Sequence, residues 1–345
     1  MCRHFSADIQ ELHIGDDLDM VIAEYEKAPL YGFSTVSKYF NTACRGIVKG
    51  QFSCYSFPSG TGKTTMGIST LVESCCKEIY DTKSNSWIDN PSYSSNGGLY
   101  IQFELAPKWE LSPKFLSAIT KVPTNHILNG SYEFDERDRV EKGKQILLES
   151  NIHTVLMPSF TLASVNQIIE EYVLIHKVDF VVFDYLSEQS NLSREIAKSN
   201  GGVSTRSDQV LATLSSGLKD LAVKFDIAML TFTQTNANID NQDILDMSCI
   251  SGARSIANKL DVGCIIAPLK PKEYKVAEEV INVGQERGFN RPKPNRIIHC
   301  YKIRFGSEQQ GIKIWGHLNL GTGEWTDCFV TDRKNNMYSM NQTRL

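Results

Sequence analysis

One run of residues carries the clearest chemistry in this chain. It lies between a short apolar segment and an expected helix and contains, in order, Phe57, Pro58, Ser59, Gly60, Thr61, Gly62, Lys63, Thr64 and Thr65. A Gly-rich turn that joins a strand to a helix and carries Gly-Lys-Thr is typical of the phosphate-binding loop of nucleoside triphosphatases. Small residues let successive backbone N–H groups turn inward around phosphate oxygens, and the N-terminus of the new helix adds positive potential.

Each part of this loop has a predicted task. Residues 59–65 should wrap the phosphates of ATP, with Lys63 reaching the β- and γ-phosphates and the Thr64 hydroxyl ligating Mg²⁺. Position 57 departs from the usual pattern, because phenylalanine stands where the first glycine is normally found. A chance Gly-rich turn is the alternative, and the strand–turn–helix context disfavours it.

Two carboxylates stand directly after apolar runs. Glu104 follows residues 99–103, and Asp184 follows the continuous apolar run 180–183. The C-terminal end of a strand in a parallel sheet is where ligands bind, and Asp184 fits the Mg²⁺-side carboxylate of a P-loop enzyme. A solvated strand-end glutamate, or an unrelated aspartate after a buried strand, would explain either residue taken alone.

Hydrophobic periodicity predicts the elements that must position these residues. Strands are expected before the loop and at 99–103, 154–157, 180–183, 227–232, 262–267 and 296–305. Helices are expected at 66–72, 161–176, 208–225 and 256–260, and 112–150 should be helical with breaks at Pro123 and Asn129. Polar composition predicts surface loops at 81–98, 186–207, 235–254 and 270–294, and residues 320–323 should turn a hairpin within 311–329.

Composition and charge narrow the class of protein. A chain of 345 residues with 41% hydrophobic and 22% charged residues is typical of a soluble globular protein with a large core. The net charge of −4 predicts no general attraction to nucleic acid, so such contacts must be local. Nine cysteines without a C-x-x-C unit favour reduced thiols in an intracellular protein. No apolar run suits a bilayer span or a signal peptide, so we expect a cytoplasmic location, in the host cytoplasm if the protein is viral, and no membrane.

The N-terminal residues form a separate leader. Asp16 or Asp17 is a suitable cap for a helix that runs to about residue 27, with an apolar face. That face comprises Leu18, Val21, Ile22 and Tyr25. It can pack on its own domain or on a neighbouring subunit, and the sequence leaves both options open.

The order of these motifs resembles the RecA-fold motor domain of DnaB-like replicative helicases, over residues 32–327. The matching segments are 34–50, 58–65, 100–105, 179–186, 230–236 and 251–261. The resemblance implies an α/β fold, with a RecA-like P-loop NTPase core, a mostly parallel sheet flanked by helices, and a C-terminal β-hairpin. It divides the chain into a leader (1–30), an ATPase domain (31–330) and a polar tail (331–345). The N-terminal domain and primase-binding collar of that family have no counterpart in the sequence, as in a phage-type enzyme.

The resemblance also assigns roles to residues. It makes Glu104 the general base, Asp184 the magnesium partner and Gln234 the sensor of the γ-phosphate. Lys302 and Arg304 fall where the family supplies a lysine and an arginine finger to the nucleotide of the neighbouring subunit. Without the resemblance, ordinary alternation on an edge strand would be the simpler explanation of these two cations.

DNA contact is predicted in the loops 186–207 and 235–254, which lie where RecA-like rings line their channel. The candidate residues are Arg194, Lys198, Arg206, Asn236 and Arg254. Asp240, Asp243 and Asp246 in the second loop repel phosphate, so plain solvated loops are the alternative.

The function that the resemblance implies is an ATP- and Mg²⁺-dependent DNA helicase. It would act as a homohexameric ring on single-stranded DNA, with 5'–3' polarity and replisome partners. Two alternatives stay open. One is a recombinase-like ATPase stimulated by DNA without unwinding, and the other is a nucleotide-switched helicase loader or regulator.

Overall fold

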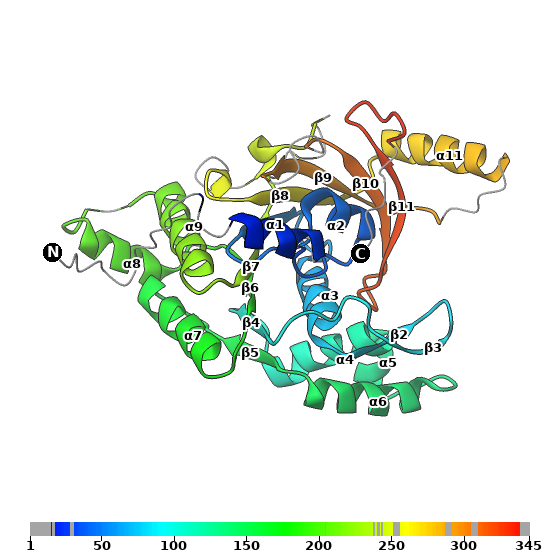
Figure 1. Ribbon diagram of the computed structural model, residues 1–345, viewed down its shortest axis with the longest axis horizontal. Helices are drawn as coiled ribbons and strands as arrows, with labels where there is room; N and C mark the ends of the chain where they lie inside the picture. Colours follow the sequence, from blue (N-terminus) through cyan, green and yellow to red (C-terminus); the bar gives the residue numbers. More distant parts are fainter. Residues whose placement is uncertain are drawn as a thin grey trace.

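A single mixed sheet organises the molecule. The computed structural model describes residues 15, 18–27, 31–203, 205–236, 239, 242, 244–250, 256–286, 292–304 and 310–338. Within this part of the chain, nine strands form one sheet in the order β11-β10-β9-β8-β1-β7-β6-β4-β5. Helices cover both of its faces (Figure 1).

Most of the sheet is parallel. The strands are β1 (Phe52–Phe57), β4 (Gly98–Gln102), β5 (Ile152–Leu156), β6 (Phe180–Asp184), β7 (Ala228–Gln234), β8 (Val262–Pro268), β9 (Arg296–Ile303), β10 (Lys313–Leu318) and β11 (Trp325–Thr331). Neighbours from β8 through β1, β7, β6 and β4 to β5 pair in parallel, and β8, β9, β10 and β11 pair antiparallel. The predicted α/β fold with a mostly parallel sheet and a C-terminal hairpin is therefore confirmed. Strands β1, β4 and β6 are buried along their whole length, as continuous apolar runs predict.

Two hydrophobic clusters fill the layers on either side of the sheet. The helices are α1 (Leu18–Lys27), α2 (Lys38–Cys44), α3 (Lys63–Cys75), α4 (Ser112–Thr120), α5 (Thr124–Asn129), α6 (Glu136–Glu149), α7 (Leu162–Leu174), α8 (Ser190–Ser199), α9 (Ser207–Lys224) and α11 (Pro271–Glu286). Phe40 of α2, Leu71 of α3 and Phe115 of α4 belong to one cluster. Val165 of α7 and Leu214 of α9 belong to the other. None of the helices within the described ranges is both long and apolar enough to cross a membrane.

Three of the predicted loops are wrong. Residues 186–207 contain helix α8, because Leu192 and Ile196 lie four residues apart and bury one face of an otherwise polar segment. Residues 270–294 contain helix α11, whose buried Ala277 and Ile281 have the same spacing. A narrow apolar stripe is enough to dock a short helix whose remaining surface is polar, so overall polarity is a poor guide to such segments.

The third segment, 81–98, carries half of a small hairpin. Strand β2 (Glu78–Asp81) pairs antiparallel with β3 (Ser86–Asp89). The rings of Tyr80 and Trp87 meet edge to face at 5.6 Å between their centroids. A cross-strand aromatic pair of this kind stabilises a polar two-stranded hairpin that the composition alone does not predict.

The ends of the described chain differ in how they pack. Helix α1 forms as predicted, but its side chains Leu18, Ile22 and Tyr25 remain about half exposed, at 49%, 54% and 52%. These three side chains therefore do not bury themselves on their own domain. Asp16, Asp17 and the side chain of Val21 lie outside the described residues.

At the other end the predicted tail begins attached to the sheet, since the backbone N of Tyr338 donates to the carbonyl of Val330.

The last strand is tied to the lead-in of the domain through one carboxylate. Asp327 of β11 accepts hydrogen bonds from the Ser37 hydroxyl (2.6 Å), the backbone N of Tyr39 (3.2 Å) and the indole Nε1 of Trp325 (2.7 Å). Ser37 in turn caps α2 by accepting from the backbone N of Phe40. Residues that lie almost the full length of the chain apart are thus fixed side by side.

We predict that Asp327→Ala lowers the free energy of unfolding by about 1–3 kcal/mol, because three partly buried donors lose their acceptor. Urea unfolding followed by circular dichroism measures the change. Asp89→Ala, at an exposed position at the end of β3, is the matched control and should be nearly neutral. Equal unfolding midpoints for the two variants would contradict the tie.

Candidate active site

Four parallel strands deliver their C-terminal ends to one edge of the sheet. In the register of β1 and β7, Phe57 lies beside Gln234, and in the register of β4 and β6, Gln102 lies beside Asp184. Strands β6 and β7 are themselves neighbours. The structure therefore brings the phosphate-binding loop, the segment that carries Glu104, and the residues Asp184 and Gln234 to the same edge.

The loop itself has the backbone that its glycines allow. Gly60 and Gly62 have positive φ angles of 71° and 120°, and helix α3 begins at Lys63. A side chain at Gly62 would also meet Leu320 and Leu318, whose Cδ2 atoms lie 2.8 and 2.9 Å from the position of its Cβ. Position 62 therefore favours glycine for its backbone conformation, and the two leucine side chains would have to shift to admit a Cβ.

The unusual Phe57 is a core residue. Its side chain is 1% exposed and packs against Phe232 of β7, with 6.0 Å between ring centroids. It belongs to the hydrophobic cluster that also contains Met66 and Leu71 of α3. The phenylalanine at position 57 is thus accommodated in the core, and the loop keeps its glycines at positions 60 and 62.

Asp184 is the central charge of the edge. It is 6% exposed, and its Oδ2 accepts from the Thr64 hydroxyl (2.9 Å) and the Tyr100 hydroxyl (2.5 Å). Its other oxygen, Oδ1, accepts no hydrogen bond from the described residues and lies 3.6 Å from Nζ of Lys63. A buried carboxylate oxygen with spare lone pairs, next to a threonine hydroxyl, is the kind of oxygen set that Mg²⁺ prefers. These residues fit a magnesium site.

Tyr100 is a site residue that the sequence did not reveal. It is fully buried in β4, and burial, followed by the charge of Asp184, raises the pKa of its phenol well above the ordinary value. The phenol therefore stays protonated and donates to Asp184. The available signal was its spacing from Gln102, since residues two apart in a strand share a face and both carry polar groups in an apolar run.

Gln102 holds the backbone that carries Glu104. Its Oε1 accepts from the backbone N of Glu104 (2.9 Å) and of Leu105 (2.7 Å), and its Nε2 donates to the carbonyl of Leu105. Gln102 is 2% exposed, so its amide is a rigid part of the core. The Glu104 carboxylate extends into the open, where Oε1 accepts from the Tyr185 hydroxyl at 3.1 Å.

Lys63 lies among these groups. Its Nζ is 3.6 Å from Asp184 Oδ1 and 3.1 Å from the centroid of the Tyr185 ring. Burial lowers the pKa of its ammonium, and the charges of Asp184 and Glu104 act in the opposite direction. A cation between two carboxylates at a Gly-rich helix start is suited to binding the charged end of a nucleotide.

Gln234 and Asn236 have different surroundings. Gln234 ends β7 exposed beside the start of the loop, and the next residue donates its backbone N to the carbonyl of Phe57 at 3.0 Å. Asn236 donates its side-chain amide to the carbonyl of Ser248, and its backbone N donates to Cys249. Its side chain thus holds its own loop together.

Lys302 and Arg304 lie at the opposite edge of the sheet. The backbone N of Arg304 donates to Asp261, whose backbone N donates to Phe52 at the start of β1. The loop follows the other end of β1, which has six residues and spans about 20 Å. The structure therefore does not bring these two cations to the loop of their own chain.

A buried aspartate anchors the arginine. Asp261 is 1% exposed and pairs with Arg304 Nη1 (2.6 Å) and Lys219 Nζ (2.6 Å). The Arg304 side chain is nevertheless 58% exposed. Lys302 donates to the carbonyl of Ala257 at 2.7 Å, and burial, followed by the charge of Arg304, lowers its pKa. Both cations are held in defined positions at the surface.

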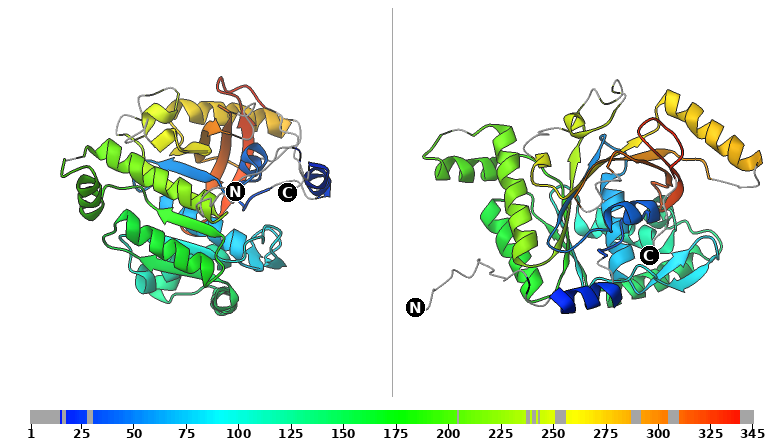
Figure 2. Two further views of the ribbon diagram at one scale, coloured as in Figure 1. Left: turned by 60° about the vertical axis from the view of Figure 1, so that its left-hand side comes forward. Right: turned by 45° about the horizontal axis from the view of Figure 1, so that its top comes forward.

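Three of the basic residues predicted to contact DNA lie on α8 or directly before α9. Arg194 and Lys198 are exposed on this helix, which projects beyond α9 from the body of the sheet (Figure 1, Figure 2). Arg206 precedes α9, is 75% exposed and pairs with Asp208 at 2.7 Å. Glu195 fixes α8 to the start of α7 by accepting from the backbone N of Leu162 (2.6 Å) and its neighbour. Arg254, Asp240 and Asp243 lie outside the described residues.

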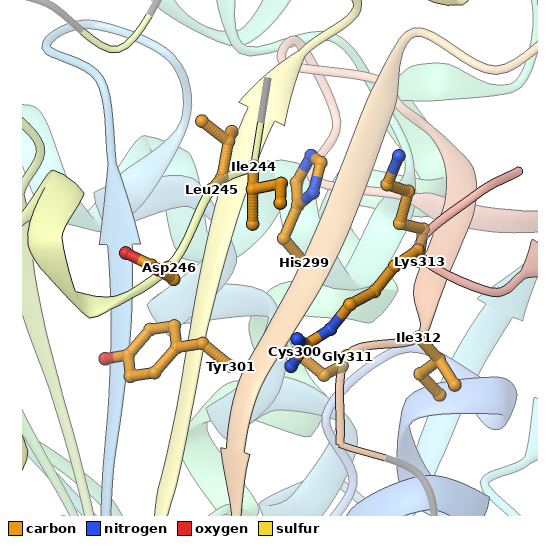
Figure 3. A pocket seen from close by; sticks show the side chains of 10 residues that line it. Ile244, Leu245, Asp246, His299, Cys300, Tyr301, Gly311, Ile312 and Lys313 are labelled. Atoms are coloured by element: carbon orange, nitrogen blue, oxygen red, sulfur yellow. The ribbon is translucent and has the colours of Figure 1, made fainter. Parts of the chain in front are cut away.

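A small hollow lies away from the loop edge. It lies between β9, β10 and residues 244–246, and Figure 3 shows its lining side chains around β9. Burial lowers the pKa of His299 to about 3, so this imidazole is neutral. Asp246 accepts from Ser248 and Lys313 donates to Asn335. Asp246 and Lys313 are therefore engaged by the fold, and the loop edge, where a cation and two carboxylates meet, is the candidate active site.

Comparisons with known proteins identify a curated relative of this chain. The curated protein "SPbeta prophage-derived uncharacterized protein YorI" of Bacillus subtilis (strain 168) is 30% identical over 335 residues, which is 96% of this chain and 64% of that protein. This chain thus spans less than two thirds of its relative.

Solved structures share the fold at low identity. A solved ATPase domain superposes with a TM-score of 0.64 at 12% identity, over 92% of this chain and 99% of that one. A DnaB-like replicative helicase, whose structure was described with its interactions with primase, superposes with a TM-score of 0.62 at 11% identity, over 92% of this chain and 67% of that one. The family model of the DnaB-like helicase C-terminal domain matches residues 32–287, more than half of the chain. The chain therefore belongs to the DnaB-like helicase C-terminal domain family.

Proposed function

We propose that this chain is the motor subunit of an ATP-dependent DNA helicase. The observation that carries the proposal is the gathering of Lys63, Asp184 and Glu104 at the end of the phosphate-binding loop. Phosphoryl transfer requires positioned phosphates, neutralised charge and an oriented water, and these residues supply a suitable group for each.

In this proposal the loop binds ATP through the backbone N–H groups of residues 59–65 and the ammonium of Lys63. Thr64 and Asp184 hold Mg²⁺, which when bound neutralises the charge that develops on the phosphates. Glu104 takes a proton from the attacking water, since its carboxylate extends from a fixed backbone into the open site. Gln234, which ends the neighbouring strand β7 beside Phe57, contacts the γ-phosphate in this proposal.

The remaining cation must come from another subunit. Arg304 is about 20 Å from its own loop by the length of β1. A heterologous ring contact joins two different surfaces of the same chain, so one subunit can present Arg304 to the loop edge of the next. Asp261 holds the guanidinium at the surface in a defined place, as such a contact requires. A homohexamer with Lys302 and Arg304 acting in the neighbouring site is therefore the assembly that we propose.

In this proposal the motor moves along single-stranded DNA. Arg194, Lys198 and Arg206 are exposed on one projecting part of the molecule, where they can contact phosphates without reading sequence. Translocation with 5'–3' polarity and association with other replication proteins complete the proposal. A recombinase-like filament would instead show DNA-stimulated hydrolysis without strand separation, and a nucleotide-switched loader would bind ATP with little turnover.

We predict that Lys63→Ala abolishes ATP hydrolysis and weakens nucleotide binding, because the phosphates lose their fixed cation. Steady-state phosphate release and titration with a fluorescent ATP analogue measure the two effects. The control is Lys83→Ala, which removes an exposed lysine from the turn of the β2–β3 hairpin. Near-normal turnover of the Lys63 variant would show that the loop takes no part in ATP hydrolysis.

We predict that Glu104→Gln retains ATP binding and loses about 10²-fold or more in turnover, since an amide cannot accept the proton of water. Glu149→Gln, at an exposed site at the end of α6, should hydrolyse ATP normally. If Glu104→Gln fails to bind ATP, the carboxylate has a structural role instead.

We predict that Arg304→Ala folds and binds ATP but loses about 10³-fold or more in turnover within the ring. Mixing this variant with Glu104→Gln should restore part of the activity, because some interfaces then pair an intact pocket with an intact arginine. The measurement is ATPase activity as a function of the mixing ratio, with co-assembly verified by native mass spectrometry. Co-assembled mixtures without any recovery would show that Arg304 does not act between subunits.

A further inference from the structure

Tyr185 connects two reacting groups of the proposed site. It directly follows Asp184 at the end of β6, and its hydroxyl donates to Glu104 Oε1 at 3.1 Å. The Lys63 ammonium lies over its ring, 3.1 Å from the centroid.

We propose that Tyr185 is a positioning residue for ATP hydrolysis: its hydroxyl orients the Glu104 carboxylate, and its ring holds the Lys63 ammonium until the phosphates of a nucleotide displace it. This inference rests on the proposed function. It links nucleotide binding to water activation, because the same side chain contacts both the lysine that binds phosphate and the glutamate that activates water.

The Glu104 carboxylate requires an orienting partner. Gln102 fixes the backbone of residue 104, but the side chain beyond it is exposed and has three torsions. The phenol of Tyr185 holds one carboxylate oxygen and leaves the other available to a water molecule. A general base works only when the proton it removes is within hydrogen-bond reach, so an unoriented carboxylate would spend little time in productive geometry.

Within the described part of the chain, Lys63 contacts the ring of Tyr185 and the carboxylate of Asp184. Phosphates that bind in the loop must draw the ammonium from the face of the ring. The ring therefore competes with the nucleotide for Lys63, and the aromatic face, rather than the hydroxyl, is the competing group. The two functions of Tyr185 can thus be separated by substitution.

The test compares Tyr185→Phe, which keeps the ring and loses the hydroxyl, with Tyr185→Leu, which loses both. Each variant is assayed for kcat and KM of ATP hydrolysis and for the Kd of the fluorescent nucleotide mant-ADP with Mg²⁺. Thermal unfolding checks that each variant is folded. Tyr93→Phe, which removes the hydroxyl of an exposed tyrosine, is the matched control and should behave as the unaltered chain.

We expect Tyr185→Phe to lower kcat by about 10-fold or more, with KM and Kd unchanged within about twofold. We expect Tyr185→Leu to lower kcat similarly and to bind mant-ADP about two- to fivefold more tightly, because the competing cation–π contact is gone. A structural role would instead lower stability, affinity and kcat together.

Two results would overturn the inference. A Tyr185→Phe variant with the kcat of the unaltered chain would show that Glu104 needs no phenol, and equal Kd values for the two variants would show that the ring does not compete for Lys63. An unaltered chain that binds mant-ADP but hydrolyses no ATP would contradict the proposed function instead. The comparison of affinities would still test the ring in that case.

Discussion

The structure depends on the parallel register that ends four strands at one edge of the sheet. Gln102 lies beside Asp184 and Phe57 beside Gln234, so segments that are far apart in the sequence meet within one site. Strands β1, β4 and β6 are buried on both faces, and a shift by one residue would turn every side chain to the opposite layer. Phe57 helps to fix this register, since its ring is locked against the core below the loop.

Charge is distributed unevenly within that site. Asp184 is buried with one oxygen satisfied by two hydroxyls and the other oxygen without a hydrogen-bond donor among the described residues. A buried carboxylate with unused lone pairs destabilises a fold unless a cation neutralises its charge. The Lys63 ammonium lies 3.6 Å from Asp184 Oδ1, too far for a strong hydrogen bond. In the function that we propose, a metal ion that binds together with a nucleotide supplies this cation. Tyr100 stays protonated next to Asp184 and orients it without adding charge.

The sequence predicted the loop, the strands that flank it and the two carboxylates, because each has a local signature of residue type and spacing. The roles of Tyr100 and Tyr185 were not predicted, since their partners Asp184 and Glu104 come from other segments and become visible only when the strand order is known. The spacing of Tyr100 and Gln102 signals only that the two side chains share one face of a strand. The position of Arg304 also depends on strand pairing. Arg304 lies at the edge of the sheet far from its own loop because β9 runs antiparallel beside β8. Helix α8 escaped prediction because two apolar residues suffice to dock it.

In the function that we propose, two edges of one sheet carry complementary parts of a catalytic site, and an assembly of subunits unites them. The most direct test of this account is strand displacement by the purified chain on a forked DNA duplex, with particles imaged under the same conditions. The account predicts closed rings that separate the strands with ATP and Mg²⁺ and fail to do so with a non-hydrolysable ATP analogue. Filaments or monomers that hydrolyse ATP without separating the strands would contradict it.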